Sequence, residues 1–400
     1  MNDSIQRAGE HALRLKADQQ SRPLNAFIYD LRQLQRQAAQ WKAALPAQCR
    51  AFYAIKANSE APILKALLPI VDGFEVASIG EVARVRAVDG AVPIIFGGPG
   101  KTNAELDGAL AQRVSLIHVE SLHEIDRLAW IARNRGVVAA VLLRVNLRGP
   151  LPAGTLQMAG APTQFGVDES DLDAAVARIK QYPQLALKGF HLHSLSNNLD
   201  VDSHSALIAC YLERFRAWKQ RYGPDLTVLN AGGGIGVNYE QPGRQFPADV
   251  FAARLRDQLV GADGDPATLI FECGRYLAAS CGYYATEVLD IRRKGGEAFV
   301  VTAGGLHHFL LPGAWKHSHP FAVVPVERWD YPFPRLEARD LPLTIVGSMN
   351  SPRDVLARQA PAAAVRIGDI ILFTHAGAYG WSISAHDFSS LPYPLHMFAD

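Results

Sequence analysis

Short β-rich runs alternate with amphipathic stretches through the first 272 residues, and this alternation constrains the fold more than any other feature. The amphipathic stretches, such as residues 61–70 and 122–135, have the apolar spacing of helices. Apolar runs bounded by such helices are typical of parallel strands that helices cover. The predicted strands are residues 49–55, 71–77, 93–96, 116–119, 140–145, 187–193, 226–231 and 268–272.

Eight such units in roughly 250 residues favour a closed (β/α)8 barrel, with an open doubly wound sheet as the alternative. After Glu272 the pattern changes to strands with few helices between them, which predicts a mostly antiparallel β domain. A strand at residues 25–30 precedes the barrel and could pair with that later domain. We therefore predict three segments: 1–31 joins the β domain, 32–273 forms the barrel, and 274–400 forms a C-terminal β-sandwich or β-barrel domain.

Composition argues against several classes of function. Apolar residues make up 48% of the chain and charged residues 20%, with a net charge of +1, which gives no sign of a nucleic-acid or membrane-surface partner. The polar N-terminus lacks the apolar core of a signal peptide, and no run is long enough to span a bilayer. The four scattered cysteines, Cys49, Cys210, Cys273 and Cys281, fit reduced thiols. A cytoplasmic protein is expected.

Polar residues recur where the predicted strands end. Lys56 follows the first barrel strand, His193 ends the sixth, a glycine-rich loop at 230–236 follows the seventh, and Glu272 ends the eighth. Chemistry in such barrels gathers at the C-terminal ends of the strands, so these groups should share one mouth. Because a buried ammonium group is costly, Lys56 either reaches water or has a chemical use.

The glycine loop suggests a phosphate site. Gly232, Gly233, Gly234 and Gly236 carry no side chains to block an anion, and their backbone N–H groups can face phosphate oxygens. Arg275 could add a forked contact. A simple tight turn is the plain alternative, and a dinucleotide site is disfavoured because no clear acidic residue ends a following strand.

A phosphate, a lysine and a carboxylate in one pocket suggest pyridoxal 5'-phosphate. Lys56 would form a Schiff base with the cofactor, which removes the cost of a free ammonium group. Glu272 would face the pyridine nitrogen and keep it protonated, and His193 could stack on the ring. A solvated lysine and a structural histidine at the strand ends are the plain alternatives.

Five motifs in order resemble the fold-type III pyridoxal phosphate decarboxylases, which include diaminopimelate and ornithine decarboxylases and share a barrel similar to that of alanine racemase. The similarity runs from about residue 25 to residue 380. The motifs are YAIKAN at 53–58, FHLHSLS at 190–196, NAGGGIG at 230–236, ECGRY at 272–276 and HAGAYG at 375–380.

This resemblance implies a role for each matching residue. Lys56 carries the cofactor, His193 stacks on it with support from Arg144, and Glu272 binds the ring nitrogen. The resemblance also implies homodimers with active sites at the interface, where a tail segment of one subunit completes the partner's site. The residues implied at the phosphate are Ser196, Gly232, Gly233, Gly234, Gly274, Arg275 and Tyr379, and Glu75, Ser78 and Glu81 match the family's second-strand motif.

The segment VGSMNSPRDVL at 346–356 departs from the family pattern. Asn350 falls where the family has a proton-donating cysteine, and an amide is not a strong acid. His307 and His308 are candidate replacements at the substrate. Ser351 stands where diamine-specific members carry an acidic residue, and Arg353 lies nearby, which favours a substrate with a distal carboxylate.

Other departures are Cys273 in place of proline, Leu195 in place of glycine and Gln164 in place of a frequent lysine. Together they suggest a specialised branch that resembles decarboxylases of carboxylate siderophore pathways. The expected activity is decarboxylation of a diamino acid or its citrate conjugate, such as citryl-diaminopropionate. Diaminopimelate decarboxylation is the alternative within the family.

Three rival functions remain open from the residues. An amino-acid racemase would need two bases on opposite faces of the cofactor and would release no CO2. A metal-dependent hydrolase could use His191 and His193 as zinc ligands, although no carboxylate pattern accompanies them. A non-catalytic cofactor-binding protein would be yellow but would form no amine.

Overall fold

The computed structural model describes residues 3–19, 22–149, 156–157, 162–259 and 264–400. The chain divides into two compact units. The barrel unit comprises Gln35–Val237 and Gln245–Leu277, and the β unit comprises Met1–Leu34, Asn238–Arg244 and Ala278–Asp400. The predicted boundaries at residues 31 and 273 lie close to these divisions and stay a prediction.

Within the described residues, eight parallel strands of the barrel unit close on themselves. The order runs from β5 through β4, β3, β2, β12, β11 and β9 to β6, and the pairing of β5 with β6 completes the ring. The closed barrel is therefore confirmed and an open sheet is excluded. The strands are β2 (Cys49–Ala54), β3 (Gly73–Val76), β4 (Ile94–Phe96), β5 (Leu116–Val119), β6 (Ala139–Asn146), β9 (Leu185–His191), β11 (Val228–Asn230) and β12 (Thr268–Glu272).

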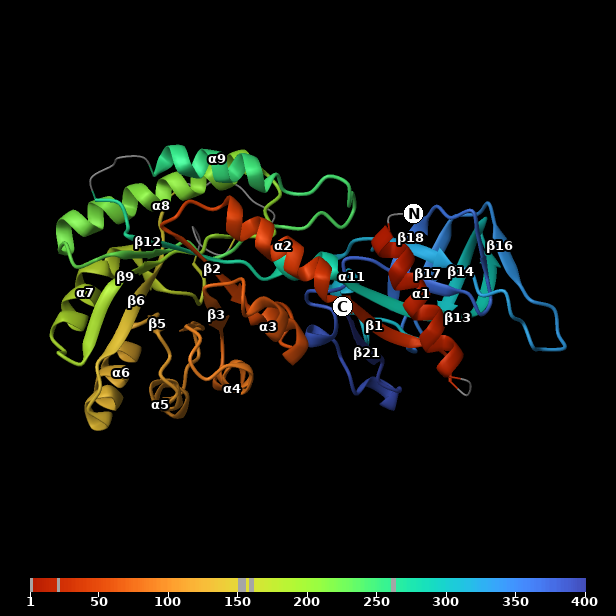
Figure 1. The fold of residues 1–400 in the computed structure, drawn as a ribbon, viewed down its shortest axis with the longest axis horizontal. Helices are drawn as coiled ribbons and strands as arrows, with labels where there is room; N and C mark the ends of the chain where they lie inside the picture. Colours follow the sequence, from red (N-terminus) through yellow and green to blue (C-terminus); the bar gives the residue numbers. More distant parts are fainter. Residues whose placement is uncertain (1–2, 20–21, 150–155, 158–161, 260–263) are drawn as a thin grey trace. The chain divides into compact units, whose positions relative to one another are not determined.

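Helices surround the barrel strands (Figure 1). Phe52, Ile95 and Ile270 form one buried cluster inside the barrel. Several helices begin at a hydroxyl side chain: Ser78 accepts from the N–H of Glu81 at the start of α4, for example. The helices are α2 (Leu31–Ala44), α3 (Ala61–Leu67), α4 (Ile79–Val88), α5 (Asn103–Ala111), α6 (Leu122–Arg135), α7 (Leu172–Lys180), α8 (Val201–Tyr222) and α9 (Ala248–Gln258).

The β unit is built from both ends of the chain. The predicted strand at 25–30 is β1 (Asn25–Asp30), and it pairs antiparallel with β13 (Gly282–Lys294) and parallel with β21 (Leu395–Ala399). Most other pairs are antiparallel, but β14 runs parallel to β17. The remaining strands of this sheet are β14 (Glu297–Thr302), β15 (Phe321–Val324), β17 (Leu343–Val346), β18 (Val355–Ala360) and β20 (Ile370–Phe373).

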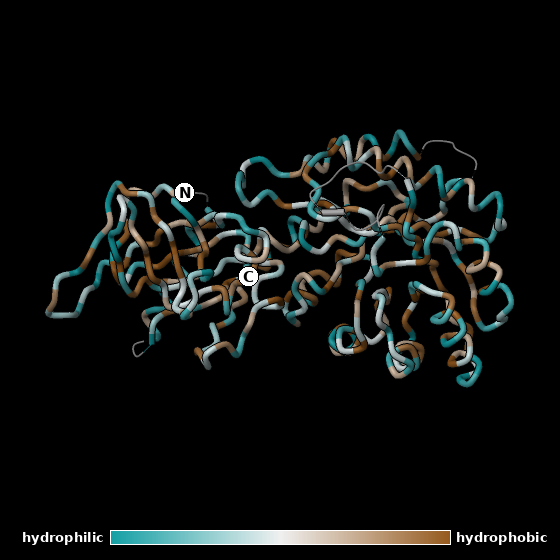
Figure 2. Tube along the Cα trace, turned by 180° about the vertical axis from the view of Figure 1, so that it is seen from behind, coloured by the Kyte–Doolittle hydropathy of each residue, from teal (hydrophilic) through white to brown (hydrophobic). Residues whose placement is uncertain are grey.

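The polar N-terminus forms a helix, α1 (Asp3–Asp18), that the sequence analysis did not predict. Ala8 and Ala12 on one face of α1 join a buried cluster with Ile28 of β1 and Leu372 of β20. Small side chains let the helix approach the sheet closely, and this explains why so polar a segment is ordered. Hydrophobic colour follows the strands in Figure 2, and surface loops are largely hydrophilic.

Among the residues described, every helix is too short or too polar to cross a bilayer.

Candidate active site

Lys56 lies on a single turn of 3-10 helix, η1 (Ile55–Ala57), directly after strand β2. The strand itself is almost wholly buried, but the Lys56 side chain is about half exposed (49%). The turn carries the lysine out of the strand end, so its amine is not enclosed in the core. Gly274 packs against this turn, since a Cβ at Gly274 would lie 2.9 Å from the carbonyl oxygen of Ala54.

The Lys56 amine is paired with a buried carboxylate from the next strand. Its Nζ lies 3.1 Å from Oε2 and 3.4 Å from Oε1 of Glu75, which is only 4% exposed at the third position of β3. Burial raises the pKa of Glu75 to about 7, although the charge of Lys56 opposes this shift. Glu75 is thus a carboxyl group close to its titration point at neutral pH.

Glu272 ends β12, and its carboxylate is held by Asn230 at the end of β11. Nδ2 of Asn230 donates to Oε1 of Glu272 over 2.6 Å, and Oδ1 of Asn230 accepts from the N–H of Gly232 over 2.9 Å. Asn230 is completely buried. One amide side chain therefore ties the glycine loop to the carboxylate.

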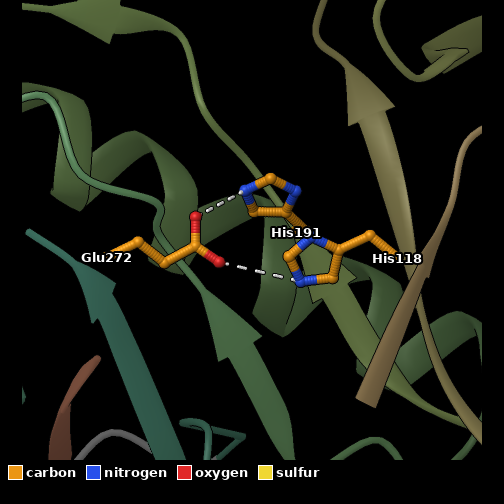
Figure 3. Close-up of side chains that lie close together, drawn as sticks. All are labelled: His118, His191 and Glu272. Atoms are coloured by element: carbon orange, nitrogen blue, oxygen red, sulfur yellow. Dashed lines mark ion pairs between the residues drawn. The ribbon is translucent and has the colours of Figure 1, made fainter. Parts of the chain in front are cut away.

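Two stacked imidazoles also lie beside the Glu272 carboxylate (Figure 3). Nε2 of His118 and Nε2 of His191 lie 3.9 and 3.6 Å from the carboxylate oxygens, and the two ring centroids are 4.0 Å apart. Burial lowers the pKa of both histidines well below the usual value, so both are neutral.

His118, His191 and Glu272 test the alternative hypothesis of a metal-dependent hydrolase. Among the described residues, the set with ligand atoms close enough for an ion is His118, His191 and Glu272. The expectation that no carboxylate accompanies His191 is therefore wrong, because Glu272 reaches it from β12. The partner of His191 in this set is His118 rather than His193, and Nε2 of His118 already lies 3.1 Å from Nδ2 of Asn230.

His193 follows β9 and lies against the glycine loop. Its Nδ1 accepts from the N–H of Gly233 over 3.3 Å. Burial, together with the charge of Arg144, lowers the pKa of His193 to about 3. His193 is therefore a neutral ring, suited to stacking rather than to proton donation.

The glycine loop has no room for side chains. A Cβ on Gly232 would lie 2.4 Å from Nδ1 of His193, and one on Gly233 would lie 2.3 Å from the carbonyl oxygen of Glu272. Gly232 and Gly234 also adopt positive φ angles of 66° and 95°. Because the loop packs this closely on His193 and Glu272, its glycines are required by the backbone itself and not only by an approaching anion.

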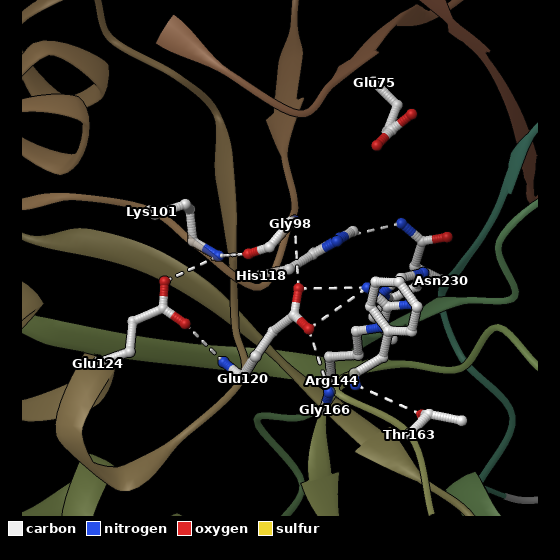
Figure 4. Close-up of polar contacts among 12 residues, drawn as sticks. Glu75, Gly98, Lys101, His118, Glu120, Glu124, Arg144, Thr163, Gly166 and Asn230 are labelled. Atoms are coloured by element: carbon white, nitrogen blue, oxygen red, sulfur yellow. Dashed lines mark hydrogen bonds and ion pairs between the residues drawn. The ribbon is translucent and has the colours of Figure 1, made fainter. Parts of the chain in front are cut away.

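Arg144 in β6 belongs to a buried charge network (Figure 4). Its guanidinium donates to Glu120 over 3.2 Å and lies 4.4 Å from the ring centre of Phe165. Glu120 also accepts from the N–H of Gly98 and of Gly166, over 3.1 and 3.0 Å. The charge of Arg144 acts on His193 through space, while its guanidinium is hydrogen-bonded to Glu120.

The same network contains a fully buried ion pair. Nζ of Lys101 lies 2.7 Å from Oε1 of Glu124 and also contacts the carbonyl oxygen of Gly98. Oε2 of Glu124 accepts from the N–H of Glu120 over 2.8 Å. The network thus fixes the loops after β4 and β5, which border the barrel mouth.

Other predicted barrel residues lie at the same strand ends. Ser196 is half-buried in the short strand β10 (Leu195–Ser196), and Arg275 is buried at the start of α10 (Arg275–Ala278), directly after Gly274. Gln164 is exposed. Lys56, His193, the glycines, Glu272 and Arg275 therefore lie at or directly after the C-terminal ends of barrel strands, and their roles stay a prediction.

Within the β unit, the loop that carries Asn350 and Ser351 is organised by Asp354. This buried carboxylate accepts from the N–H groups of Leu306 and Met349 over 2.7 and 2.8 Å. Asn350 and Arg353 are exposed, and Oγ of Ser351 accepts from the N–H of Arg353 over 3.2 Å.

The two candidate histidines of the β unit differ in their contacts. His308 is buried, with Nδ1 2.9 Å from the Tyr284 hydroxyl and Nε2 2.8 Å from the carbonyl oxygen of Pro392. Both of its nitrogens are engaged, so a structural role accounts for it. His307 is also buried, and neither of its nitrogens has a hydrogen-bond partner in the described structure. Tyr379 is half-buried with a positive φ of 53°.

Sequence reasoning missed His118, Asn230, Glu120 and Lys101 as site residues. Each lies at or just after the end of a barrel strand, so position was the available signal. His118 and Asn230 lie within apolar runs. A polar residue in such a run is usually interpreted as structural, because the sequence does not show its neighbours across the barrel.

The residues at the mouth fit pyridoxal phosphate by their chemistry. They offer a primary amine next to a carboxylate, a second buried carboxylate held by an amide, a neutral imidazole and a backbone loop without side chains. Amine, carboxylate and anion-binding loop are the three functions that this cofactor requires.

Comparisons with known proteins agree with this chemistry. Residues 31–279 match the family described as "Pyridoxal-dependent decarboxylase, pyridoxal binding domain". The chain is 44% identical over 379 residues, 95% of each chain, to 2-[(L-alanin-3-ylcarbamoyl)methyl]-2-hydroxybutanedioate decarboxylase of Staphylococcus aureus. It is 30% identical, over 93% of this chain and 87% of the relative, to L-glutamyl-[BtrI acyl-carrier protein] decarboxylase of Niallia circulans. The structure of Helicobacter pylori diaminopimelate decarboxylase with L-lysine superposes with a TM-score of 0.83 at 26% identity, covering 96% of this chain and 94% of that one.

Proposed function

Because the chain belongs to the pyridoxal-dependent decarboxylases, we propose that it removes the α-carboxylate of a diamino acid joined to citrate. The chain is an amino-acid carboxy-lyase with pyridoxal 5'-phosphate as its cofactor. The observation that carries the substrate proposal is the 44% identity, over 95% of both chains, to the Staphylococcus aureus enzyme. The name of that relative describes citrate in amide linkage to carbon 3 of L-alanine, which is citryl-diaminopropionate.

A second relative supports a conjugated substrate. The Niallia circulans enzyme is named for an L-glutamyl group carried on a protein, so it too acts on an amino acid joined to something larger. The diaminopimelate decarboxylases of Aquifex aeolicus and Zymomonas mobilis are less similar, at 27% and 29% identity.

The charges of the residues proposed for the distal end of the substrate also favour the citrate conjugate over a free diamino acid. Ser351 has no charge with which to form an ion pair with a distal ammonium group, whereas Arg353 can form one with a carboxylate of citrate. The siderophore assignment belongs to the same proposal, because carboxylate and hydroxyl oxygens are the hard donors from which a carboxylate siderophore is made.

We propose the following roles at the barrel mouth. Lys56 holds the cofactor, His193 packs on its ring, and Gly232 to Gly234 present N–H groups to its phosphate, with Ser196, Gly274, Arg275 and Tyr379 as further contacts. Pyridoxal phosphate, when bound, supplies the electron sink for decarboxylation. Glu272 holds a proton on the ring nitrogen, and Asn230 keeps the Glu272 carboxylate pointing at it.

A CO2-release assay tests the substrate. The purified enzyme with its cofactor is offered citryl-diaminopropionate, free 2,3-diaminopropionate and meso-diaminopimelate. We expect the highest kcat/KM on the citrate conjugate, with one amine formed per CO2. Preference for meso-diaminopimelate would refute the proposed substrate while leaving the reaction class intact. Solvent deuterium exchange at the α-carbon without CO2 would support a racemase instead.

We also propose that the protein is a cytoplasmic homodimer with active sites at the interface, as the family resemblance implies. Light scattering of the purified protein should give a mass near 87 kDa, about twice the 43.6 kDa chain.

A further inference from the structure

The return of a proton to the α-carbon lacks an obvious donor in this chain. Asn350, at the position of the family's cysteine, bears an amide that has no acidic proton to give at neutral pH. His308 is held at both ring nitrogens by Tyr284 and Pro392. His193 is neutral, and its Nδ1 is occupied by the N–H of Gly233. Burial lowers the pKa of His307 to about 4, so this ring is not an imidazolium acid at neutral pH. We therefore look for the donor among the other groups at the barrel mouth.

Glu75 has the position that a proton donor needs. Its Oε2 lies 3.1 Å from Nζ of Lys56, the atom that must leave and return to the reacting centre in each turnover. Glu75 is 4% exposed, whereas the Lys56 side chain is 49% exposed toward the mouth. The carboxyl group is thus shielded from water and can exchange protons with the site through the lysine.

The charges around Glu75 favour its protonated form whenever Lys56 is not an ammonium ion. Glu272 on β12 and Glu81 on α4 both raise the pKa of Glu75, after burial as the main cause, and Lys56 opposes them. On the β5 side, the neutral ring of His118 approaches the same space, since a Cβ on Gly97 would lie 3.1 Å from Nδ1 of His118 and 3.6 Å from Oε1 of Glu75. With Lys56 in a covalent bond, the ammonium ion that opposes this rise in the pKa of Glu75 is lost.

We propose that Glu75 and Lys56 form a proton relay that protonates the α-carbon after CO2 has left. This inference rests on the proposed decarboxylase function and names the group that completes it. Glu75 stores the proton, and Lys56 delivers it.

The protons balance over one turnover. While Lys56 is bound covalently, Glu75 holds a proton taken up from solvent, which is the one proton that each decarboxylation consumes. The substrate amine gives its ammonium proton to solvent on binding, and the product amine regains one on release. Glu75 Oε2 then gives a proton to the freed amine Nζ of Lys56. The Lys56 ammonium transfers a proton to the electron pair that CO2 has left on the α-carbon. Lys56 is then a neutral amine, which is the form that can displace the product.

The first experiment follows the products of the loaded enzyme. A general acid contributes about 10²–10⁴-fold to such a transfer. We expect Glu75→Gln to form amine about a hundredfold more slowly than the wild type. A larger share of the turnovers that release CO2 should then end in a carbonyl product and inactive enzyme. Glu75→Asp should restore most of the one-to-one ratio of amine to CO2. A purely structural role would lower both products together and keep that ratio at one.

The second experiment uses the full chain freed of cofactor. An amine-acylating reagent is applied across a pH series, and modification of Lys56 is followed by peptide mass spectrometry. Removing the partner carboxylate in Glu75→Gln should shift the onset of Lys56 labelling to lower pH, and Glu75→Asp should shift it back. Glu287→Gln is the matched control, because it removes a partly buried carboxylate paired with Lys16 at 2.6 Å in the β unit.

The outcomes separate the two proposals. If the wild-type enzyme releases no CO2 from any amino acid or conjugate, the proposed function fails. If the wild type releases CO2, and Glu75→Gln keeps both the one-to-one ratio and the wild-type labelling profile, the relay is refuted and the decarboxylase function stands.

Discussion

Asn230 and Glu272 are joined by a hydrogen bond of 2.6 Å between Nδ2 and Oε1, at the centre of the barrel mouth. The same asparagine accepts from the backbone of Gly232 over 2.9 Å. The carboxylate that we propose for the ring nitrogen and the loop that we propose for the phosphate therefore share one anchor, Asn230.

This anchor predicts a cofactor-binding defect in Asn230→Ala. Loss of a buried hydrogen bond to a charged group costs about 1.5–3 kcal/mol, so the Kd for pyridoxal phosphate should rise about tenfold to a hundredfold. Fluorescence titration of the cofactor-free protein measures it, and thermal unfolding checks that the variant is folded. Asn103→Ala, which removes a contact with Arg127 on the outer helices, should leave the Kd unchanged.

Lys56→Ala should abolish turnover and the visible absorbance of the bound cofactor, because it removes the amine that holds the aldehyde. Borohydride reduction of the wild type followed by peptide mass spectrometry should place the cofactor on the Lys56 peptide alone. Lys65→Ala is the control, since that exposed lysine lies on the same part of the chain, in α3. A label on another lysine would contradict the assignment.

Glu272→Gln should slow CO2 release. The neutral amide cannot hold a proton on the ring nitrogen, so the transition state loses a charge-assisted contact of about 1.5–3 kcal/mol, or about tenfold to a hundredfold in kcat. Stopped-flow measurement of CO2 in a single turnover isolates this step. A rate equal to that of the wild type would remove Glu272 from its proposed role.

Much of this architecture could be predicted from sequence because it depends on local patterns. The eight barrel strands occur where apolar runs predict them, within a few residues. In contrast, β18 has little strand signal because its residues alternate only weakly, and α1 was not predicted because its buried face consists of alanines and a glycine. Such elements are stabilised by their partners and carry little signal of their own.

The site was predictable in part for the same reason. Lys56, His193 and Glu272 stand at the ends of clear strands, so a barrel brings them together. The pairing of Lys56 with Glu75, and of Asn230 with Glu272, depends on which strands are neighbours around the ring and on side-chain direction. The spacing of residues within one strand predicts neither of these two pairings.

The raised pKa of Glu75 predicts a dependence of stability on pH. Burial moves this pKa from 4.5 to about 7, so the folded protein keeps a proton that the unfolded chain has already released between those values. The stabilisation is present at low pH and is lost as the pH rises through about 7. Glu75→Gln cannot ionise, so its free energy of unfolding relative to wild type should increase by up to about 3 kcal/mol between about pH 5 and pH 8.

Urea unfolding of the cofactor-free proteins at both pH values measures this difference. The comparison with wild type cancels the opposite trend from buried neutral histidines such as His191, whose lowered pKa reduces stability at acid pH. A difference that does not change with pH would mean that Glu75 titrates normally in the folded protein.

Substrate choice should follow charge in the loop that contains Ser351 and Arg353. Asp354 fixes this loop through the N–H groups of Leu306 and Met349, so changes at the two exposed or half-buried positions should alter charge and leave the loop's backbone in place. The double variant Ser351→Glu/Arg353→Ala adds a carboxylate and removes a cation in the loop that we propose for the distal end of the substrate. We expect kcat/KM for citryl-diaminopropionate to fall about tenfold to a hundredfold, while kcat/KM for meso-diaminopimelate rises.

Arg358→Ala removes an exposed arginine from the neighbouring strand β18 and should leave the ratio of the two constants unchanged. An equal loss on both substrates would instead show that the loop supports the site without selecting the substrate.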